Sequence, residues 1–268
     1  MNISILGCGW LGLPLAKKLI EAGHIVKGST TNRDKINLLS SEGIIPYKIE
    51  LFEEGVQGDM ISFLKDSEVL IIDIPPGLRK DPEVNFVGKI GRLKSYIEKS
   101  DIKKVLFVSA TSVFEDGNDF PVYTEEDSAN GTAENAIQLK GAEMLLRNSE
   151  TYVTSIIRFG GLLGPGRHPV NYLSGKSDLK DPEAPVNLIH LEDCIGIISA
   201  ILEKEAWGET FHGVFPDHPT RKEYYSRIAK EKGLAIMSFK EDTVSKGKVI
   251  SSKVLQKELQ YEFVQNIW

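Results

Sequence analysis

Short apolar runs alternate with amphipathic segments from the first residues of this chain onward, and this alternation restricts the possible folds more than any other feature. The amphipathic segments are long enough to act as crossover helices between strands. Such a pattern is typical of a parallel sheet covered by helices. The runs expected to form buried strands are residues 3–6, 25–28, 47–51, 69–74, 105–109 and 153–159. The helices expected among them are residues 13–22, 86–99 and 132–148.

The fold predicted from this alternation is α/β, a doubly wound parallel Rossmann sheet of about seven strands with a smaller C-terminal α/β lobe. The regular pattern breaks at a Gly- and Pro-rich passage, residues 160–185. Beyond it, we expect a helix at about 192–204, a strand at 210–214 and helices near 222–232 and 252–259.

A glycine pattern follows the first predicted strand directly. It has the spacing G-x-G-x-x-G and reads Gly7-Cys8-Gly9-Trp10-Leu11-Gly12. Between a strand and a helix, this spacing indicates a dinucleotide-binding turn: the first glycine permits the bend, the second lets the main chain approach a pyrophosphate, and the third allows close helix packing. The anion would lie at the helix N-terminus. The alternative, a plain turn, does not explain all three glycines. The expected cofactor contacts are Gly7, Gly9, Trp10, Leu11 and Gly12.

The residues after the second predicted strand indicate which dinucleotide binds. Sites that prefer NAD place an acidic residue about 20 positions beyond the glycines, where it binds the ribose 2′-hydroxyl. This chain has Thr31, Asn32 and Arg33 in that region, and no carboxylate before Asp34. Hydroxyl, amide and guanidinium groups suit a 2′-phosphate. We therefore expect NADP as the cofactor in preference to NAD. The alternative is that Arg33 is a solvated loop cation and Asp34 faces the ribose.

The pattern also predicts how the domains are divided. We expect a dinucleotide-binding Rossmann domain over residues 1–165, completed by about 187–215. Residues 166–186 and 216–268 would form a small substrate-binding lobe.

Charge and cysteine content exclude several function classes. The 268 residues include 32 Lys and Arg against 38 Asp and Glu, a net charge of −6, with no block of five like charges. Such a chain has no electrostatic footprint for nucleic acid or an anionic membrane, so a small molecule is the expected partner. Cys8 and Cys194 form no metal-ligand set with the five histidines, and two cysteines cannot build a disulfide framework. A cytoplasmic protein is expected, and no apolar run approaches the roughly 20 residues of a membrane helix. The sequence leaves the oligomeric state open.

Several further motifs resemble the short-chain dehydrogenase/reductase superfamily, in its extended, nucleotide-sugar epimerase-like division and within an atypical branch. The resemblance covers nearly the whole chain. Beside the glycine pattern, its landmarks are residues 108–114, 121–128, 157–161, 164–167, 187–193 and 255–263. One departure lies in the glycine pattern itself, because extended members usually carry a glycine where Leu6 stands.

The resemblance implies catalytic positions that this chain fills differently. The family uses a Tyr four residues before a Lys, where the Lys lowers the phenol pKa for proton exchange, together with a nearby Ser or Thr. Counting back from Lys140 gives Ala136, and a register set by Glu143 gives Asn135. Ala110 stands at the Ser position. Neither an alanine nor an asparagine can be a phenol acid, so ordinary reductase or epimerase chemistry is in doubt.

Other residues are candidates for the missing roles. Thr111, Ser112 and Tyr123 lie in segments that follow a strand, where sites form in such sheets. Lys140 is a candidate for the catalytic site and for the nicotinamide ribose. The alternatives are a partly buried loop tyrosine for Tyr123 and a solvated lysine for Lys140. Pro75, which follows the fourth predicted strand, would form a wall of the cofactor crevice, or else belongs to a plain turn.

The landmarks of the second half receive mostly structural interpretations. We expect Arg158 to pair inside a buried strand and His190 to bond main chain at a strand-to-helix junction. Arg167, beyond Gly166 in a loop, could bind an anionic substrate group. Gly161 stands where sugar-nucleotide epimerases carry an amide, which puts a nucleotide-sugar substrate in doubt. Glu192 and Asp193 look like helix-starting carboxylates that bind free N–H groups.

Three functions follow in order of preference. The first is an NADP(H)-binding oxidoreductase-like protein of the atypical short-chain dehydrogenase/reductase type, acting on an unidentified small molecule. The second is a non-catalytic NAD(P)-binding sensor or partner protein. The third is an active nucleotide-sugar epimerase or dehydratase.

Overall fold

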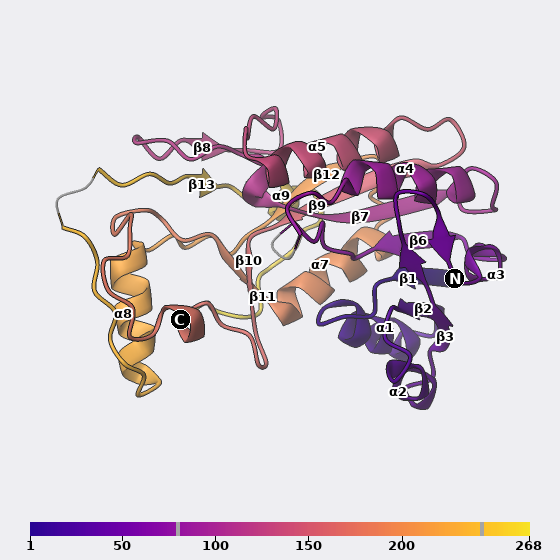
Figure 1. Ribbon diagram of the computed structural model, residues 1–268, viewed down its shortest axis with the longest axis horizontal. Coiled ribbons are helices and arrows are strands. Elements are labelled where there is room, and N and C mark those ends of the chain that lie inside the picture. The colour runs from indigo at the N-terminus through magenta and orange to yellow at the C-terminus, as the bar shows by residue number, and fades with distance from the viewer. Residues whose placement is uncertain (79–80, 242–243) are drawn as a thin grey trace. The chain divides into compact units, whose positions relative to one another are not determined.

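The computed structural model describes residues 1–78, 81–241 and 244–268. Within these residues, the main sheet has seven strands in the order β12-β9-β7-β6-β1-β2-β3 (Figure 1). β1 pairs in parallel with β2 and β6, and the sheet continues in parallel from β2 to β3 and from β6 to β7. Because the chain starts in the middle and winds toward both edges, the predicted doubly wound Rossmann sheet is confirmed. The strands are β1 (Asn2–Leu6), β2 (Ile25–Thr30), β3 (Ile45–Lys48), β6 (Val69–Ile72), β7 (Lys104–Ala110), β9 (Val153–Phe159) and β12 (Thr210–Gly213).

Helices connect the strands as crossovers. In α4, Phe86, Ile90, Leu93 and Ile97 are all buried, so the apolar spacing forms one core-facing stripe. Asn85 caps that helix, because its side chain accepts a hydrogen bond from the N–H of Gly88. The helices are α1 (Gly12–Glu21), α2 (Lys35–Ser41), α3 (Met60–Leu64), α4 (Phe86–Ile97), α5 (Glu134–Arg147), α6 (Val170–Leu173), α7 (Leu191–Glu203), α8 (Arg221–Glu231) and α9 (Lys253–Glu258), with a 3₁₀ turn at Thr111–Val113. α2, α3 and α6, all short, were not predicted.

Short strand pairs lie outside the main sheet. β4 (Glu50–Leu51) and β5 (Val56–Gln57) form an antiparallel hairpin. The predicted strand over 47–51 was wrong in its extent, because β3 ends at Lys48 and the hairpin starts at Glu50. Two parallel pairs join β10 (Gly161–Leu163) to β11 (Leu188–His190), and β8 (Val122–Tyr123) to β13 (Val249–Ile250).

The chain forms two compact units. Unit 1 contains residues 1–109, 133–157 and 201–210, and unit 2 contains residues 110–132, 158–200 and 211–268. In unit 1, α4 and α5 lie side by side against the sheet, and α1 and α2 cover its other face (Figure 1). Each unit gathers the residues that lie close together in space. The expected division of the chain near residue 165 stays a prediction. No helix among the described residues is long and apolar enough to cross a membrane.

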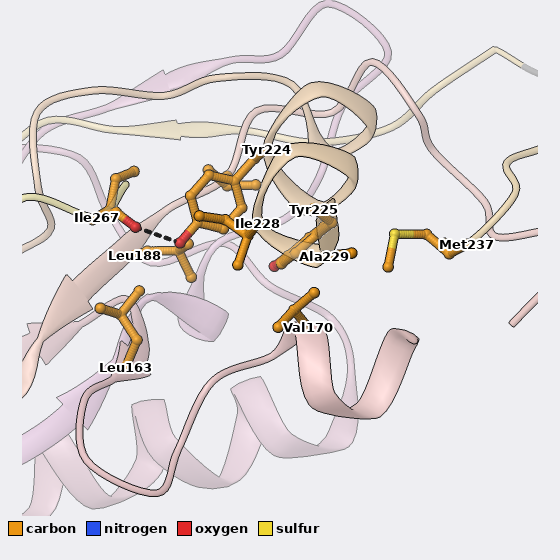
Figure 2. Close-up of a cluster of buried hydrophobic side chains, with 10 residues drawn as sticks. Leu163, Val170, Leu188, Tyr224, Tyr225, Ile228, Ala229, Met237 and Ile267 are labelled. Carbon is orange, nitrogen blue, oxygen red and sulfur yellow. Dashed lines mark hydrogen bonds between the residues drawn. The ribbon is translucent and has the colours of Figure 1, made fainter. Parts of the chain in front are cut away.

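Unit 2 has its own apolar core, built around the fully buried Tyr224 of α8. Figure 2 shows α8 packed over side chains from β10, β11, α6 and the C-terminal segment. The Tyr224 hydroxyl donates a hydrogen bond of 2.7 Å to the carbonyl of Ile267, so the end of the chain is tied into this core. The buried members are Leu163, Val170, Val186, Leu188, Tyr224, Tyr225, Ile228, Ala229, Met237 and Ile267.

Candidate functional site

Two glycines of the loop after β1 are required by close main-chain packing. Gly7 has φ +111°, and a Cβ there would overlap the carbonyl oxygen of Asp73. A Cβ on Gly12 would overlap the carbonyl oxygen of Gly7. The absence of a side chain at Gly7 lets the loop pack against the residue that follows β6. The absence of one at Gly12 lets the start of α1 pack against the loop.

Gly9 is different, because the described chain does not require a glycine there. This residue is exposed, and no heavy atom among the described residues lies within 4 Å of the position that its Cβ would take. α1 begins three residues later, its N-cap residue Leu11 provides no side-chain cap, and its first turn has no acidic residue. Uncapped N–H groups and the positive end of the helix dipole suit an anion. The geometry thus fits a pyrophosphate that approaches the main chain at Gly9.

Hydrogen bonds to β2 hold the loop in place. The N–H of Gly7 donates to the Ser29 hydroxyl (2.9 Å), and the N–H of Cys8 donates to the Ser29 carbonyl (2.7 Å). The Cys8 side chain is buried against Gly28, as expected for a small residue that faces the sheet. Burial, reinforced by the charge of Asp73, raises the pKa of the Cys8 thiol to about 12, so this thiol is not a nucleophile at neutral pH.

Asp73 is a residue that sequence reasoning missed. It directly follows β6, and its Oδ2 lies 3.2 Å from the position that a Cβ on Gly12 would take. The signal was available, since Asp73 is the first polar residue after a run of buried ones. A carboxylate therefore lies beside the glycine loop. Pro75, the predicted crevice wall, is exposed two residues further along the same loop.

The segment after β2 is exposed and polar. Thr30 accepts a hydrogen bond from the N–H of Asn32 (3.1 Å), and Asn32 accepts one from the N–H of Asp34 (2.9 Å). Thr31, Asn32 and Arg33 are all exposed. No side chain of the described residues pairs with the Arg33 guanidinium. Asp34 is also exposed and its side chain does not cap α2.

Lys35 adds a second cation that the sequence analysis did not single out. This exposed residue begins α2, and its charge acts to lower the pKa of the Cys8 thiol. The positive charge of Lys35 therefore acts electrostatically on the glycine loop. Arg33 and Lys35 together make this edge of unit 1 attractive to an anion.

α5 carries the positions implied by the family's Tyr and Lys. Ala136 is fully buried, whereas Asn135 and Lys140 are partly buried. The Ser109 hydroxyl at the end of β7 donates a hydrogen bond of 2.6 Å to the buried Glu143 carboxylate, which fixes the helix against the strand. A buried methyl group at Ala136 cannot exchange a proton, in agreement with the departure noted in the sequence.

Unit 2 holds the hydroxyl candidates. Thr111 is buried in the 3₁₀ turn, and the neighbouring Ser112 is exposed. The Tyr123 hydroxyl donates to the Glu115 carbonyl (3.1 Å) and accepts from the Asn130 amide (3.0 Å). These contacts suit the alternative of a loop tyrosine with a packing role, and the catalytic role of Tyr123 stays a prediction.

A buried group of charged and aromatic side chains adjoins Tyr123 in unit 2. The Phe114 ring stacks on Tyr123 at 4.5 Å, contacts His212 edge-on at 5.3 Å, and lies 5.1 Å from the guanidinium carbon of Arg158. Glu125 accepts a hydrogen bond of 3.1 Å from the N–H of His212. Burial lowers the pKa of His212 to about 3 and raises the pKa of Glu125. His212 and Glu125 were missed because their contacts with each other and with Phe114 and Arg158 join segments far apart in the chain.

The remaining predicted residues belong to unit 2 as well. His190 makes the expected main-chain hydrogen bond, because its Nδ1 accepts from the N–H of Glu192 at 3.2 Å. Arg167 is exposed in a tight turn closed by two main-chain hydrogen bonds with Gly164. A Cβ on Gly161 would lie 2.8 Å from a terminal methyl carbon of Leu188, so a side chain at this exposed position would require the Leu188 side chain to shift.

One expectation needs correction. Asp193 does lie in the first turn of α7, but it does not bind the free N–H groups of that helix. Its buried carboxylate instead accepts hydrogen bonds from the Tyr261 hydroxyl (3.0 Å) and the N–H groups of Val264 (2.8 Å) and Gln265 (3.1 Å). The Asp193 carboxylate therefore binds donors of residues 261–265 and does not cap its own helix. The described residues contain no group of three His, Cys, Asp or Glu side chains that could hold a metal ion.

The sequence and the fold of this chain are similar to those of known proteins. No family model matches the chain. The chain is 32% identical over 264 residues to protein YeeZ of Escherichia coli strain K12, an alignment that covers 98% of this chain and 95% of that protein. It is similar in structure to UDP-glucuronic acid 4-epimerase from Bacillus cereus in complex with NAD, with a TM-score of 0.81, 17% identity and coverage of 99% and 92%.

A second solved structure gives the same result. It is a short-chain dehydrogenase/reductase superfamily protein from Agrobacterium tumefaciens with bound NAD, with a TM-score of 0.78, 16% identity and coverage of 99% and 93%. At such identities the likeness concerns the fold. The expected short-chain dehydrogenase/reductase fold, of the nucleotide-sugar epimerase type, is confirmed.

Proposed function

This chain belongs to the family of protein YeeZ, and from this premise and the loop geometry we propose that it binds NADP(H) and acts as an atypical oxidoreductase on a small molecule. The observation that carries the proposal is the open space at Gly9, in front of a helix whose N-cap residue, Leu11, provides no side-chain cap. A glycine that packing does not need, at the position where a pyrophosphate approaches, is explained by a ligand.

The choice of NADP over NAD is argued from charge. A 2′-phosphate adds a dianion at the end of β2, where Arg33 and Lys35 are exposed. Asn32 and Thr31 add an amide and a hydroxyl to the same segment. The two structural relatives described above contain NAD, so the preference is a property that we propose for this chain alone.

The nicotinamide would supply a hydride acceptor or donor, and the chain would supply orientation and a proton. With a methyl group at Ala136, the proton must come from another group. We place this role among Thr111, Ser112 and Tyr123, with Lys140 on the nicotinamide ribose. Among the three residues, Ser112 is the most exposed, because Thr111 is buried and Tyr123 is partly buried.

A non-catalytic sensor is the second candidate. It is favoured by the two alanines, Ala110 and Ala136, that stand where the family has its hydroxyl and phenol. An active nucleotide-sugar epimerase or dehydratase ranks third. One relative in structure is a UDP-glucuronic acid epimerase, but this chain has Gly161, which carries no side chain, at the position of the epimerases' amide.

Two measurements separate these functions. Fluorescence titration with NADPH and NADH tests binding, and we expect tighter binding of NADPH. Arg33→Gln should lower the affinity for NADPH by about 10- to 100-fold, because charge-assisted hydrogen bonds are worth about 1.5–3 kcal/mol. The affinity for NADH should stay unchanged. Lys18→Gln, which removes an exposed cation from α1, is the matched control. Tighter binding of NADH, or no binding of either nucleotide, would refute the proposal.

Turnover then distinguishes an enzyme from a sensor. A screen of carbonyl compounds and nucleotide sugars would follow the absorbance of the reduced cofactor. Turnover that is lost in Ser112→Ala or Tyr123→Phe identifies the relocated acid. Binding without turnover across the whole screen favours the sensor.

A further inference from the structure

We propose that unit 1 has a second small-molecule site, in the cavity between α3 and α4, and that this site takes an anion with an apolar body. The cavity has a volume of about 500 Å³ and is also lined by the turn of the β4–β5 hairpin. This volume falls within the range of small-molecule sites in proteins. The inference does not depend on the dinucleotide.

The cavity is separate from the glycine loop. Lys65 comes shortly before β6, and Lys99 comes shortly before β7, so this end of the cavity lies near the amino ends of those strands. The glycine loop and Arg33 follow the carboxyl ends of β1 and β2. Because these strands are parallel, the cavity lies toward their amino ends and the glycine loop lies at their carboxyl ends.

Three cations line the cavity: Lys65, Arg92 and Lys99. Two carboxylates, Glu54 and Asp101, line it too, but none of the ion pairs among the described residues involves any of these five groups. The lining therefore carries an excess of one positive charge in a protein whose net charge is −6. An anion would gain partners there without breaking an existing ion pair.

Arg92 is held in a fixed orientation. Its Nε donates a hydrogen bond of 2.8 Å to the Glu53 carbonyl, which anchors one edge of the guanidinium to the hairpin. No other hydrogen bond of this side chain is formed within the described residues. The terminal nitrogens can therefore present parallel N–H groups, the arrangement that binds a carboxylate or phosphate in bidentate fashion.

The rest of the lining supplies an apolar wall. Ile61 and Leu64 lie one turn apart on α3; Ile61 is 72% exposed, whereas Leu64 is buried. Tyr96 of α4 lines the same space, with the hydroxyl-bearing Ser95 and Ser100 beside it. A ligand with a ring or short chain next to its charge would cover this surface.

Calorimetric titration with phenyl phosphate tests the site, because this probe combines a ring with a dianion. We expect saturable binding to the wild-type protein, and weaker binding of benzyl alcohol and of inorganic phosphate, each of which lacks one half of the probe. Arg92→Gln should weaken phenyl phosphate by about tenfold or more, since a charge-assisted bidentate contact is lost. Lys89→Gln removes one charge from the same helix outside the cavity and should change nothing.

The dinucleotide site is excluded as the source of the signal in two ways. Phenyl phosphate should bind Arg33→Gln and the NADPH-saturated protein as it binds the wild type. The inference is overturned if no saturable heat appears at millimolar probe, if Arg92→Gln binds as well as wild type while its thermal unfolding is unchanged, or if NADPH displaces the probe. Failure to bind NADPH would overturn the proposed function and leave this site standing.

Discussion

At the scale of single residues, the three glycines of the loop have different physical reasons. Gly7 and Gly12 are fixed by the chain itself, because a Cβ on either would overlap main-chain oxygen. Gly9 meets nothing among the described residues. A substitution at Gly9 therefore separates ligand binding from folding, which a substitution at the other two cannot do.

Gly9→Ala should lower the affinity for NADPH by roughly tenfold or more. Its methyl group would hold the pyrophosphate away from main-chain N–H groups, and hydrogen bonds to a charged group contribute about 1.5–3 kcal/mol. Thermal unfolding without ligand should stay close to wild type. Gly55→Ala is the matched control, since Gly55 also has open space around its missing Cβ but lies in the β4–β5 hairpin. Unchanged affinity in Gly9→Ala would contradict a dinucleotide at this loop.

His168 gives unit 2 a pH-dependent stability. Its Nδ1 accepts a hydrogen bond from the N–H of Val170 (3.1 Å), so the neutral ring has its proton on Nε2, next to the Tyr224 hydroxyl (3.1 Å). Burial lowers the pKa of His168 from 6.5 to about 4. The unfolded chain binds more protons between these values, so the free energy of unfolding falls as the pH drops from 6.5 toward 4. Burial of His212 acts in the same direction.

Urea denaturation across this pH window measures the effect. Replacing the ring by His168→Gln removes one titrating group, so the free energy of unfolding should depend less steeply on pH than in wild type. Equal slopes for the two proteins would show that His168 does not contribute.

At the scale of elements, α7 anchors the end of the chain. Asp193 accepts its three hydrogen bonds from residues 261–265, and a Cβ on Gly196, one turn later, would overlap the Tyr261 hydroxyl. The helix and the C-terminal segment therefore fit each other closely. This contact explains why a helix-start carboxylate is fully buried.

Asp193→Asn should destabilise the protein by about 2 kcal/mol or more, because the buried carboxylate accepts three hydrogen bonds with its two oxygens and an amide offers only one oxygen to the same donors. Glu192→Gln makes the same chemical change at an exposed position in the same turn and should cost little. Equal unfolding free energies for the two variants, from denaturant titration, would argue against the anchoring role.

The elements that sequence reasoning found and missed differ in length. Long helices such as α4 and α5 show several turns of apolar spacing, so their periodicity is readable. The two-residue strands β8 and β13 have no period, and they pair across more than a hundred residues of chain. Pairing of that kind is decided by tertiary contacts.

At the scale of the whole molecule, nucleotide binding is linked to stability. A ligand that binds only the folded chain stabilises it by about 2.7 kcal/mol at a hundred times its dissociation constant. We expect NADPH to raise the midpoint of thermal unfolding more than NADH does at equal concentration. Scanning calorimetry of wild type and Gly9→Ala with each nucleotide measures this. An equal shift in both proteins would assign the effect to a site other than the glycine loop.

The sequence by itself determined the fold class and the position of the glycine loop, because both depend on local periodicity and spacing. Only the tertiary structure decided which side chains are buried together. It brought His212 against Phe114 and Glu125 against His212, gave Asp193 partners near the C-terminus, and placed Asp73 beside the glycine loop. The physical reason is that burial and hydrogen-bond partners depend on residues far apart in the chain, and local sequence carries no record of them.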